Sequence, residues 1–359
     1  MDDRLPLATT PGALTPAWVT AALRAGGTLD EATTVTAVEA EAVGTGQVCD
    51  SYRLHLTADG PAPASVVAKL PAADPTSRAT ATALRCYELE VRFYQELAPT
   101  LPVRSPRPLH ADIELPGADF TLLLEDLAPA RQGDQLAGCP PDDAAAAVAE
   151  LARLHAPRWG DPDLAAITWL FRDPEASRSS LGGLLPSLHD GFRARYRDRL
   201  GEEVVEACDE LFGNLDGHLR PRSGPVTIVH GDYRLDNLLF DGLGGDVPVV
   251  VLDWQTVSTG PAMADVAYFI GAGMDPEVRQ ANEEALVGSY LDALAAAGVA
   301  GYGRDEAWEA YRRGTWGGLV MAVAASMLVE RTERGDEMFL TMATRHARHA
   351  LDLEAPALL

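Results

Sequence analysis

The chain has 359 residues, of which 47% are hydrophobic and 23% are charged, and these fractions are typical of folded globular domains. This length exceeds what one hydrophobic core usually organises, so we expect one large two-lobed domain or two domains. Acidic residues outnumber basic ones by 53 to 29, and the resulting net charge of −24 argues against nucleic-acid and membrane partners, because it repels their phosphates.

Two other features of the whole chain bear on its location. No apolar segment is long enough to span a bilayer, and the first ten residues lack the basic-then-apolar order of a signal peptide. We therefore expect a cytoplasmic protein, either a monomer or a homodimer. The four cysteines form no CxxC pair, so we expect neither a disulfide framework nor a zinc site.

The first part of the chain is predicted to form an antiparallel sheet with one main helix. Segments 34–41, 52–56 and 65–70 alternate or are rich in β-branched residues, which is typical of successive strands. Apolar residues recur at three-to-four spacing over 77–97 and predict a helix that Pro99 ends. A buried type of strand follows at 120–124, and we place the boundary between lobes 1–126 and 127–359 just after it.

The remainder of the chain is predicted to be mostly helical. Asp142 and Asp143 follow two prolines and precede an alanine-rich helical pattern, as helix-capping residues do. Two short apolar runs, 226–229 and 247–252, interrupt the helices and are predicted strands. Helices then continue to the end of the chain, with breaks near 271–276 and 298–303.

Lys69 is the only lysine in the sequence, and all the other residues counted among Lys and Arg are arginines. A lysine presents a compact point charge on a flexible stem, whereas an arginine presents a planar fork. The lone lysine therefore indicates a site where a fork does not fit, with chance in an arginine-rich chain as an equal explanation.

Each of the two predicted strands in the second part ends in a polar cluster. The first is followed by HGDYRLDN, residues 230–237, and the second by Asp253, Trp254 and Gln255. The catalytic loop of kinases is H-R-D-x-x-x-x-N, and His230, Asp232 and Asn237 stand at its offsets, with glycine in place of the arginine. Phosphoryl transfer needs such acids together with a cation on the phosphates, because the protein mainly positions groups and neutralises charge.

On these motifs the chain resembles the aminoglycoside phosphotransferase and choline-kinase-like superfamily, from about residue 43 to the C-terminal helices. HGDYRLDN with DWQ is more narrowly similar to bacterial relatives of the ecdysteroid-kinase-like group. The resemblance implies an α+β protein-kinase-like fold with two lobes. It also implies magnesium-dependent transfer of the γ-phosphate of ATP, with GTP as the alternative nucleotide, to a hydroxyl of a small molecule such as an antibiotic, a sugar, a sterol or an amino alcohol.

The resemblance assigns roles to individual residues of these motifs. It implies that Asp232 orients the acceptor hydroxyl and takes its proton, while Asn237 and Asp253 hold magnesium. Lys69 matches the residue that contacts the α- and β-phosphates, and Glu90 matches the ion-pair partner of that lysine.

Glu88 is the competing candidate for the ion-pair partner of Lys69, and the other implied nucleotide contacts come from backbone groups. Glu88 lies two residues before the preferred ion-pair partner and thus on another helix face. Backbone groups of Glu125 and Leu127 match the hinge that hydrogen-bonds adenine. Gly44 and Gly46 match the loop that covers the phosphates, although cysteine stands where that loop has its third glycine.

Several polar residues near these motifs have structural explanations. We expect His230 to hold its turn by hydrogen bonds and His155 to lie in the core. Asp265 is expected to brace the catalytic loop or cap a helix, and Asp236 to stabilise a turn or face solvent. Arg234 has two equal explanations, because it either faces the acceptor or the transferred phosphate, or it pairs with a nearby carboxylate.

Three other functions remain as alternatives, namely a nucleotide-binding pseudokinase without turnover, a kinase acting on protein side chains, and a metal-dependent hydrolase. The acceptor itself stays open, and we expect its specificity to reside in residues 271–336. The acidity of the chain fits a cationic acceptor or a solubility trait equally well.

Overall fold

The computed structural model describes residues 4–44, 48–116, 119–170, 173–220 and 224–359. The chain divides into two compact units. Unit 1 comprises the chain up to Thr100 together with Ser105–Pro129 and Asp253–Thr256, and unit 2 comprises Leu101–Arg104, Ala130–Leu252 and Val257–Leu359. The short segment that begins at Asp253 thus belongs to unit 1, although the residues on both sides of it belong to unit 2.

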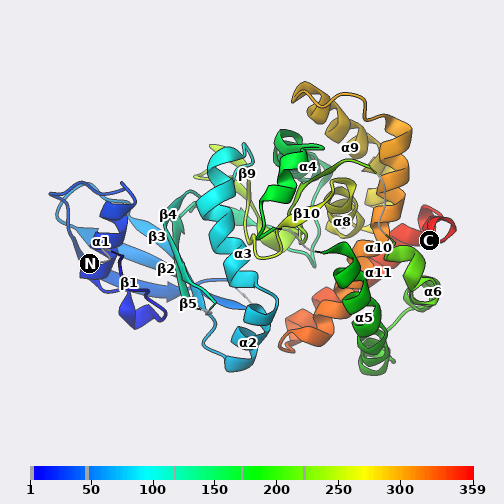
Figure 1. Ribbon diagram of the computed structural model, residues 1–359, viewed down its shortest axis with the longest axis horizontal. Coiled ribbons are helices and arrows are strands. Elements are labelled where there is room, and N and C mark those ends of the chain that lie inside the picture. The colour runs from blue at the N-terminus through cyan, green and yellow to red at the C-terminus, as the bar shows by residue number, and fades with distance from the viewer. Residues whose placement is uncertain (1–3, 45–47, 117–118, 171–172, 221–223) are drawn as a thin grey trace. The chain divides into compact units, whose positions relative to one another are not determined.

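Unit 1 is built on a five-stranded antiparallel sheet with the order β1-β2-β3-β5-β4 (Figure 1). The three strands predicted first in the sequence are confirmed as antiparallel neighbours. The strands are β1 (Val35–Ala42), β2 (Cys49–Ala58), β3 (Ser65–Pro71), β4 (Pro108–Glu114) and β5 (Asp119–Glu125). Lys69 lies on β3 opposite Ser51 of β2 and Leu122 of β5, so its backbone is paired on both sides.

A helix that the sequence analysis did not predict packs against this sheet. Helix α1 (Pro16–Ala25) begins with the Thr15 hydroxyl accepting from the amide of Trp18, at 3.3 Å, and with proline at its first position. Its buried residues share a core with side chains of β2, β3 and β5. The sequence was not read as helical over α1, although the capping signal is present there.

The helix predicted over 77–97 is three helical segments instead of one. They are α2 (Pro75–Ala83), α3 (Cys86–Arg92) and a π-helical turn η2 (Phe93–Leu97). The break lies at Arg85, whose φ of 61° is left-handed and cannot continue a right-handed helix. Helix α3 is thereby set off from α2, and it carries Glu90 on its buried side.

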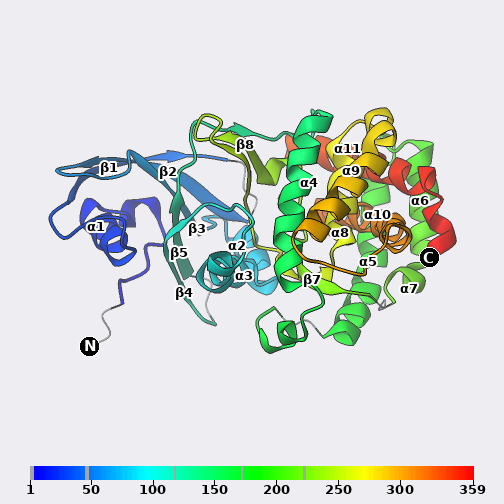
Figure 2. The same ribbon diagram turned by 90° about the horizontal axis from the view of Figure 1, so that it is seen from above.

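Unit 2 is mostly helical, as predicted, with two small antiparallel sheets (Figure 2). Strand β7 (Val226–Val229) pairs with β10 (Ser258–Pro261), while β8 (Leu238–Gly242) pairs with β6 (Arg131–Gln132) and β9 (Val247–Val251). The helices are α4 (Pro141–His155), α5 (Pro174–Tyr196), α6 (Glu202–Gly213), α7 (Leu215–His218), α8 (Met263–Gly273), α9 (Pro276–Ala296), α10 (Arg304–Leu328) and α11 (Glu333–Asp352). The strands at 226–229 and near 247–252 are thus confirmed, and each leads into one of the polar motifs.

Helix α8 is almost completely buried. Nearly all of its residues are buried, including the polar Asp265 and Tyr268. A helix that is apolar on every face belongs in a core, and α8 packs against α10 and α11. The polar side chains of α8 therefore need partners inside the protein.

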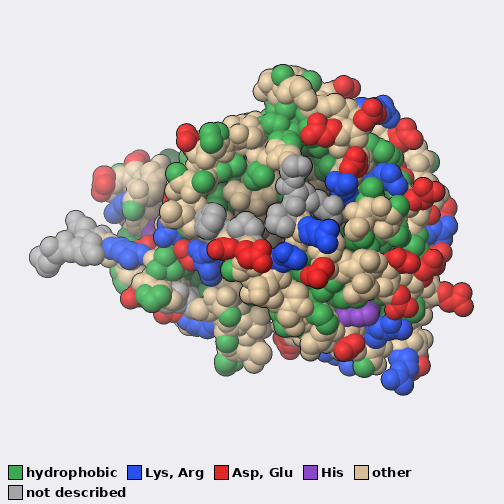
Figure 3. Space-filling model, turned by 45° about the vertical axis from the view of Figure 1, so that its right-hand side comes forward, with side chains coloured by type: hydrophobic (Ala, Val, Ile, Leu, Met, Phe, Trp, Pro, Cys, Tyr) green, Lys and Arg blue, Asp and Glu red, His purple; other side chains and the backbone are tan. Residues whose placement is uncertain are grey.

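Charged side chains of both signs lie on the face shown in Figure 3. Aspartate and glutamate are spread widely over this face and are interspersed with basic side chains. Among the helices of the described residues, none combines the length and the apolar character needed to cross a lipid bilayer.

Candidate active site

The loop after β7 is held by hydrogen bonds to Asp265 of α8. The carboxylate of Asp265 accepts from the amides of His230, at 2.6 Å, and Gly231, at 3.0 Å, and its other close partner is the His155 ring at 3.3 Å. Burial tends to raise the pKa of Asp265, but these donors outweigh burial and lower it. The loop is therefore fixed by a buried carboxylate 35 residues away in sequence.

His230 and His155 both have structural contacts. The Nε2 atom of His230 lies 2.9 Å from the carbonyl oxygen of Leu252, and its Nδ1 accepts from the amide of Asp232 at 3.2 Å. His155 is fully buried, as predicted, and lies 2.7 Å from the hydroxyl of Tyr290. His230 thus ties the start of the loop to the end of β9.

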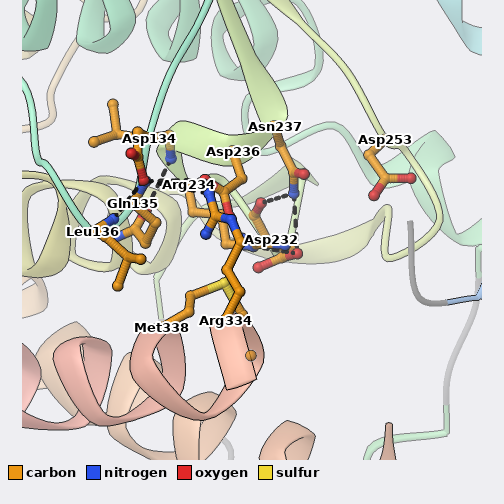
Figure 4. Close-up of polar contacts among 12 residues, drawn as sticks. Asp134, Gln135, Leu136, Asp232, Arg234, Asp236, Asn237, Asp253, Arg334 and Met338 are labelled. Carbon is orange, nitrogen blue, oxygen red and sulfur yellow. Dashed lines mark hydrogen bonds and ion pairs between the residues drawn. The ribbon is translucent and has the colours of Figure 1, made fainter. Parts of the chain in front are cut away.

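Asp232 is the centre of the polar network in unit 2 (Figure 4). Its Oδ1 accepts from the hydroxyl of Tyr268 at 2.6 Å, and its Oδ2 accepts from Asn237 Nδ2 at 3.0 Å and from Arg234 Nε at 3.2 Å. The Asp232 side chain is 15% exposed, so the carboxylate is held firmly but still reaches the surface.

Asn237 presents its amide in one defined orientation. Its Nδ2 donates to the backbone carbonyl of Asp232, at 2.9 Å, as well as to the carboxylate. This assigns the amide nitrogen to Asp232 and leaves the amide oxygen to accept from, or coordinate, another group. The carbonyl of Asn237 accepts from the amide of Leu252 at 2.9 Å, and Leu252 directly precedes Asp253.

Arg234 joins the loop that follows β7 to α11. Its Nη1 donates to Asp236 Oδ2, at 2.6 Å, and lies 3.1 Å from the sulfur of Met338 (Figure 4). Burial tends to lower the pKa of Arg234, but Asp232 and other neighbours raise it. Of the two explanations for this arginine, pairing with nearby carboxylates is the one seen here. Arg334 of α11 lies 3.4 Å from Asp236 and adds a second, looser ion pair.

In unit 1, Lys69 is a nearly buried cation between two carboxylates. Its Nζ lies 2.5 Å from Glu90 Oε1 and 2.9 Å from Asp253 Oδ1. Burial tends to lower the pKa of Lys69, but Asp253 and its other neighbours outweigh this effect and hold the pKa well above its ordinary value. Glu88 instead pairs with Arg85 and Arg92, so Glu90 is the acid that reaches the lysine.

The segment that carries Asp253 is held in an unusual conformation. Asp253 has a φ of 65°, and Gln255 Nε2 donates to its Oδ2 at 3.0 Å. Trp254 is fully buried and stacks on Phe93, with ring centroids 3.7 Å apart and planes 7° apart. Left-handed backbone at a residue other than glycine is uncommon and persists where packing stabilises it, and this stacking supplies such packing.

The backbone groups predicted to contact the nucleotide are those of Glu125, Leu127, Gly44 and Gly46. The amide of Glu125 donates to the carbonyl of Arg107 at 2.9 Å. Within the described residues, neither the amide nor the carbonyl of Leu127 is hydrogen-bonded to the protein. Gly44 has a φ of 77°, which favours glycine, and Gly46 lies outside the described residues.

Tyr268 is the residue of this network that the sequence analysis missed. It lies in the apolar pattern of α8, where an aromatic residue is most simply explained by packing. Tyr268 follows Asp265 by three residues, so the two side chains lie on the same face of the helix, and this spacing was the one available signal that Tyr268 is near the loop.

Across the described ranges, no group of three or more His, Cys, Asp or Glu side chains is arranged to hold a metal ion.

Two curated proteins match short parts of the chain. A 64-residue segment is 45% identical to acyl-CoA dehydrogenase family member 10 of Mus musculus, covering 18% of this chain and 6% of that protein. A 74-residue segment is 35% identical to acyl-CoA dehydrogenase family member 11 of Gallus gallus, covering 21% of this chain and 9% of that protein. The matched regions thus span less than a tenth of the length of these two relatives.

Solved structures match nearly the whole chain. Choline kinase from Cryptosporidium parvum Iowa II superposes with a TM-score of 0.56 at 11% identity, covering 95% of this chain and 92% of that one. Plasmodium vivax ethanolamine kinase gives 0.54 at 12% identity, with coverages of 94% and 89%. The predicted α+β kinase-like fold is thereby confirmed.

The sequence model of the phosphotransferase enzyme family, APH, matches residues 39–313. This range holds more than half of the chain and includes Lys69, Asp232 and Asp253. The chain belongs to the phosphotransferase enzyme family.

Proposed function

We propose that this phosphotransferase moves the γ-phosphate of ATP to a hydroxyl group of a small molecule, with Asp232 as the catalytic base. The observation that carries the proposal is the carboxylate of Asp232, which is held by three donors yet reaches the surface. A base that orients and deprotonates an alcohol needs this combination of fixed geometry and access.

In the proposed reaction the acceptor hydroxyl donates a hydrogen bond to the Asp232 carboxylate. The hydroxyl oxygen forms a bond to the γ-phosphorus while the bond from that phosphorus to the bridging oxygen breaks. The hydroxyl proton passes to Asp232, and the electron pair of the broken bond stays with the ADP that leaves. The products are a phosphate monoester and ADP.

Asn237 and Asp253 are the proposed magnesium ligands. Both offer oxygen atoms, the donor type that magnesium prefers, and the Asn237 amide oxygen is the one left over after Nδ2 binds Asp232. Asp253 already accepts from a cation, the Lys69 ammonium, so its environment suits positive charge. When bound, magnesium neutralises the charge of the β- and γ-phosphates.

Lys69 is proposed to contact the α- and β-phosphates, with Glu90 fixing its position. The buried ion pair supports this role, because it keeps the ammonium charged and in place. The backbone of Glu125 and Leu127 is proposed to bind adenine, and the unbonded backbone of Leu127 supports that assignment.

Three further assignments belong to the same proposal. Gly44 and Gly46 are proposed to cover the phosphates. Residues 1–126 are assigned to a nucleotide-binding lobe and residues 127–359 to a catalytic and acceptor-binding lobe.

For the acceptor we propose a hydroxylated small molecule, namely an antibiotic, a sugar, a sterol or an amino alcohol. These are the kinds of acceptor that the resemblance to the ecdysteroid-kinase-like group and its relatives implies. Two structural neighbours are named for choline and ethanolamine, which are amino alcohols. A net charge of −24 attracts such a cationic acceptor.

The proposal is tested by incubating the protein with ATP, magnesium and a panel of hydroxylated metabolites and antibiotics, and searching by mass spectrometry for a phosphate-sized mass gain. Product that requires both ATP and the wild-type Asp232 is expected. Thermal stabilisation by ATP without transfer to any acceptor would instead indicate the pseudokinase alternative.

A further inference from the structure

Tyr268 contacts Asp232 from a helix that no motif marks as catalytic. Building on the proposed function, we infer that Tyr268 is a positioning residue that sets the direction of the Asp232 carboxylate, so that Oδ1 is the oxygen that receives the proton of the acceptor hydroxyl.

The hydrogen bonds of Asp232 identify the receiving oxygen. An ionised carboxylate offers about four acceptor positions, two on each oxygen. Oδ2 already accepts from both Asn237 Nδ2 and Arg234 Nε, whereas among the described residues Oδ1 accepts only from the Tyr268 hydroxyl. The remaining position is therefore on Oδ1, next to the phenol that holds it.

Tyr268 is itself held in place by tight packing. Its side chain is buried, and its ring lies against that of His346, with centroids 5.4 Å apart. His346 is wedged between two helices, because a Cβ at Gly318 of α10 would overlap its ring and one at Gly271 of α8 would lie 2.8 Å from its Nδ1. The phenol thus points at Asp232 from a support with little room to move.

The phenol also keeps its proton at neutral pH. Burial and the nearby Asp232 carboxylate raise the pKa of Tyr268 well above its ordinary value. A protonated phenol is a donor to Oδ1, and at 2.6 Å the bond has the length typical of a hydroxyl on a carboxylate.

Without the phenol, the donors on Asp232 would all lie on Oδ2. The carboxylate would then be held through Oδ2 alone and would have more freedom to change its orientation, so Oδ1 would spend less time aimed at the acceptor. We expect this to lower the rate of transfer without changing how ATP binds, because the Tyr268 hydroxyl donates to the proposed base and not to a residue proposed to bind the nucleotide.

The test compares Tyr268→Phe with Tyr196→Phe. Tyr196 is a matched control, because its buried hydroxyl also donates to a carboxylate at 2.6 Å, that of Asp336. With an acceptor from the mass-spectrometric panel, Tyr268→Phe is expected to lower kcat about tenfold to a hundredfold, the loss of one hydrogen bond to a charged group, with the KM for ATP unchanged. Tyr196→Phe is expected to keep the wild-type kcat.

The outcomes separate this inference from the function on which it rests. Absence of transfer by the wild-type protein overturns the proposed function, and crystal structures of wild type and Tyr268→Phe then decide the inference. A carboxylate of Asp232 that is rotated or disordered only in the variant supports it, and an unchanged carboxylate overturns it. Equal kcat values for the two variants overturn it as well.

Discussion

Substitution of Asp265 by asparagine tests whether the loop that follows β7 depends on one buried carboxylate. Asp265 accepts from the amides of His230 and Gly231, and hydrogen bonds to a charged group contribute about 1.5–3 kcal/mol each. Asp265→Asn keeps one oxygen, which makes one neutral bond of about 1 kcal/mol, and turns an NH2 group toward the other amide. We therefore expect a loss of about 3 kcal/mol in the free energy of unfolding.

The assay is urea unfolding, compared with that of Asp173→Asn. Asp173 accepts from two amides at the start of α5, at 2.9 and 3.0 Å, but it is exposed. Asparagine caps helices as well as aspartate does, so this control should change stability by no more than about 0.5 kcal/mol. Equal shifts in the urea midpoints of the two variants would refute the reasoning.

The same carboxylate predicts a pH dependence. Because the pKa of Asp265 is lowered from 3.8 in the folded protein, its contribution is complete above that value and is lost as the pH falls through the folded-state pKa. The stability difference between wild type and Asp265→Asn should accordingly shrink below pH 3.8. A difference that stays constant on acidification contradicts this assignment.

Three further substitutions test the remaining parts of the site. Asp232→Asn should lower phosphate transfer by a factor of about 10²–10⁴ while ATP still raises the melting temperature, and unchanged turnover would exclude Asp232 as the base. Lys69→Met should destabilise the protein by about 3–5 kcal/mol in urea, because Glu90 is left buried and unpaired, and adding Glu90→Gln should restore part of the loss. Trp254→Ala should cost about 3–5 kcal/mol by removing the ring stacked on Phe93, and a loss below 1 kcal/mol would contradict the packing described.

The sequence was most informative where chemistry is concentrated in a short segment. His230, Asp232 and Asn237 lie within eight residues, so their spacing alone indicated a kinase-like loop. The strands that deliver this loop and Asp253 were equally clear, because short apolar runs bounded by polar clusters are a local signal. Local patterns failed at Arg85, where a left-handed residue divides a continuous helical periodicity.

Choices between equivalent residues needed the tertiary structure. Glu88 and Glu90 have the same side chain and nearly the same place in sequence, and only the packing of α3 against β4 and β5 of the sheet turns one toward Lys69 and the other toward arginines. Arg234 likewise had two open roles until its neighbours were known.

By itself the sequence indicated the strands and the kinase-like motifs, because strand periodicity and motif spacing are properties of neighbouring residues. The resemblance that those motifs carry implied the kinase-like fold and the candidate acids, amide and lysine. Only the tertiary structure decided how the loop is braced and how Asp232 is oriented. Asp265 and Tyr268 reach that loop across more than thirty residues of chain, and such contacts arise from helix packing, which leaves no spacing rule in the sequence.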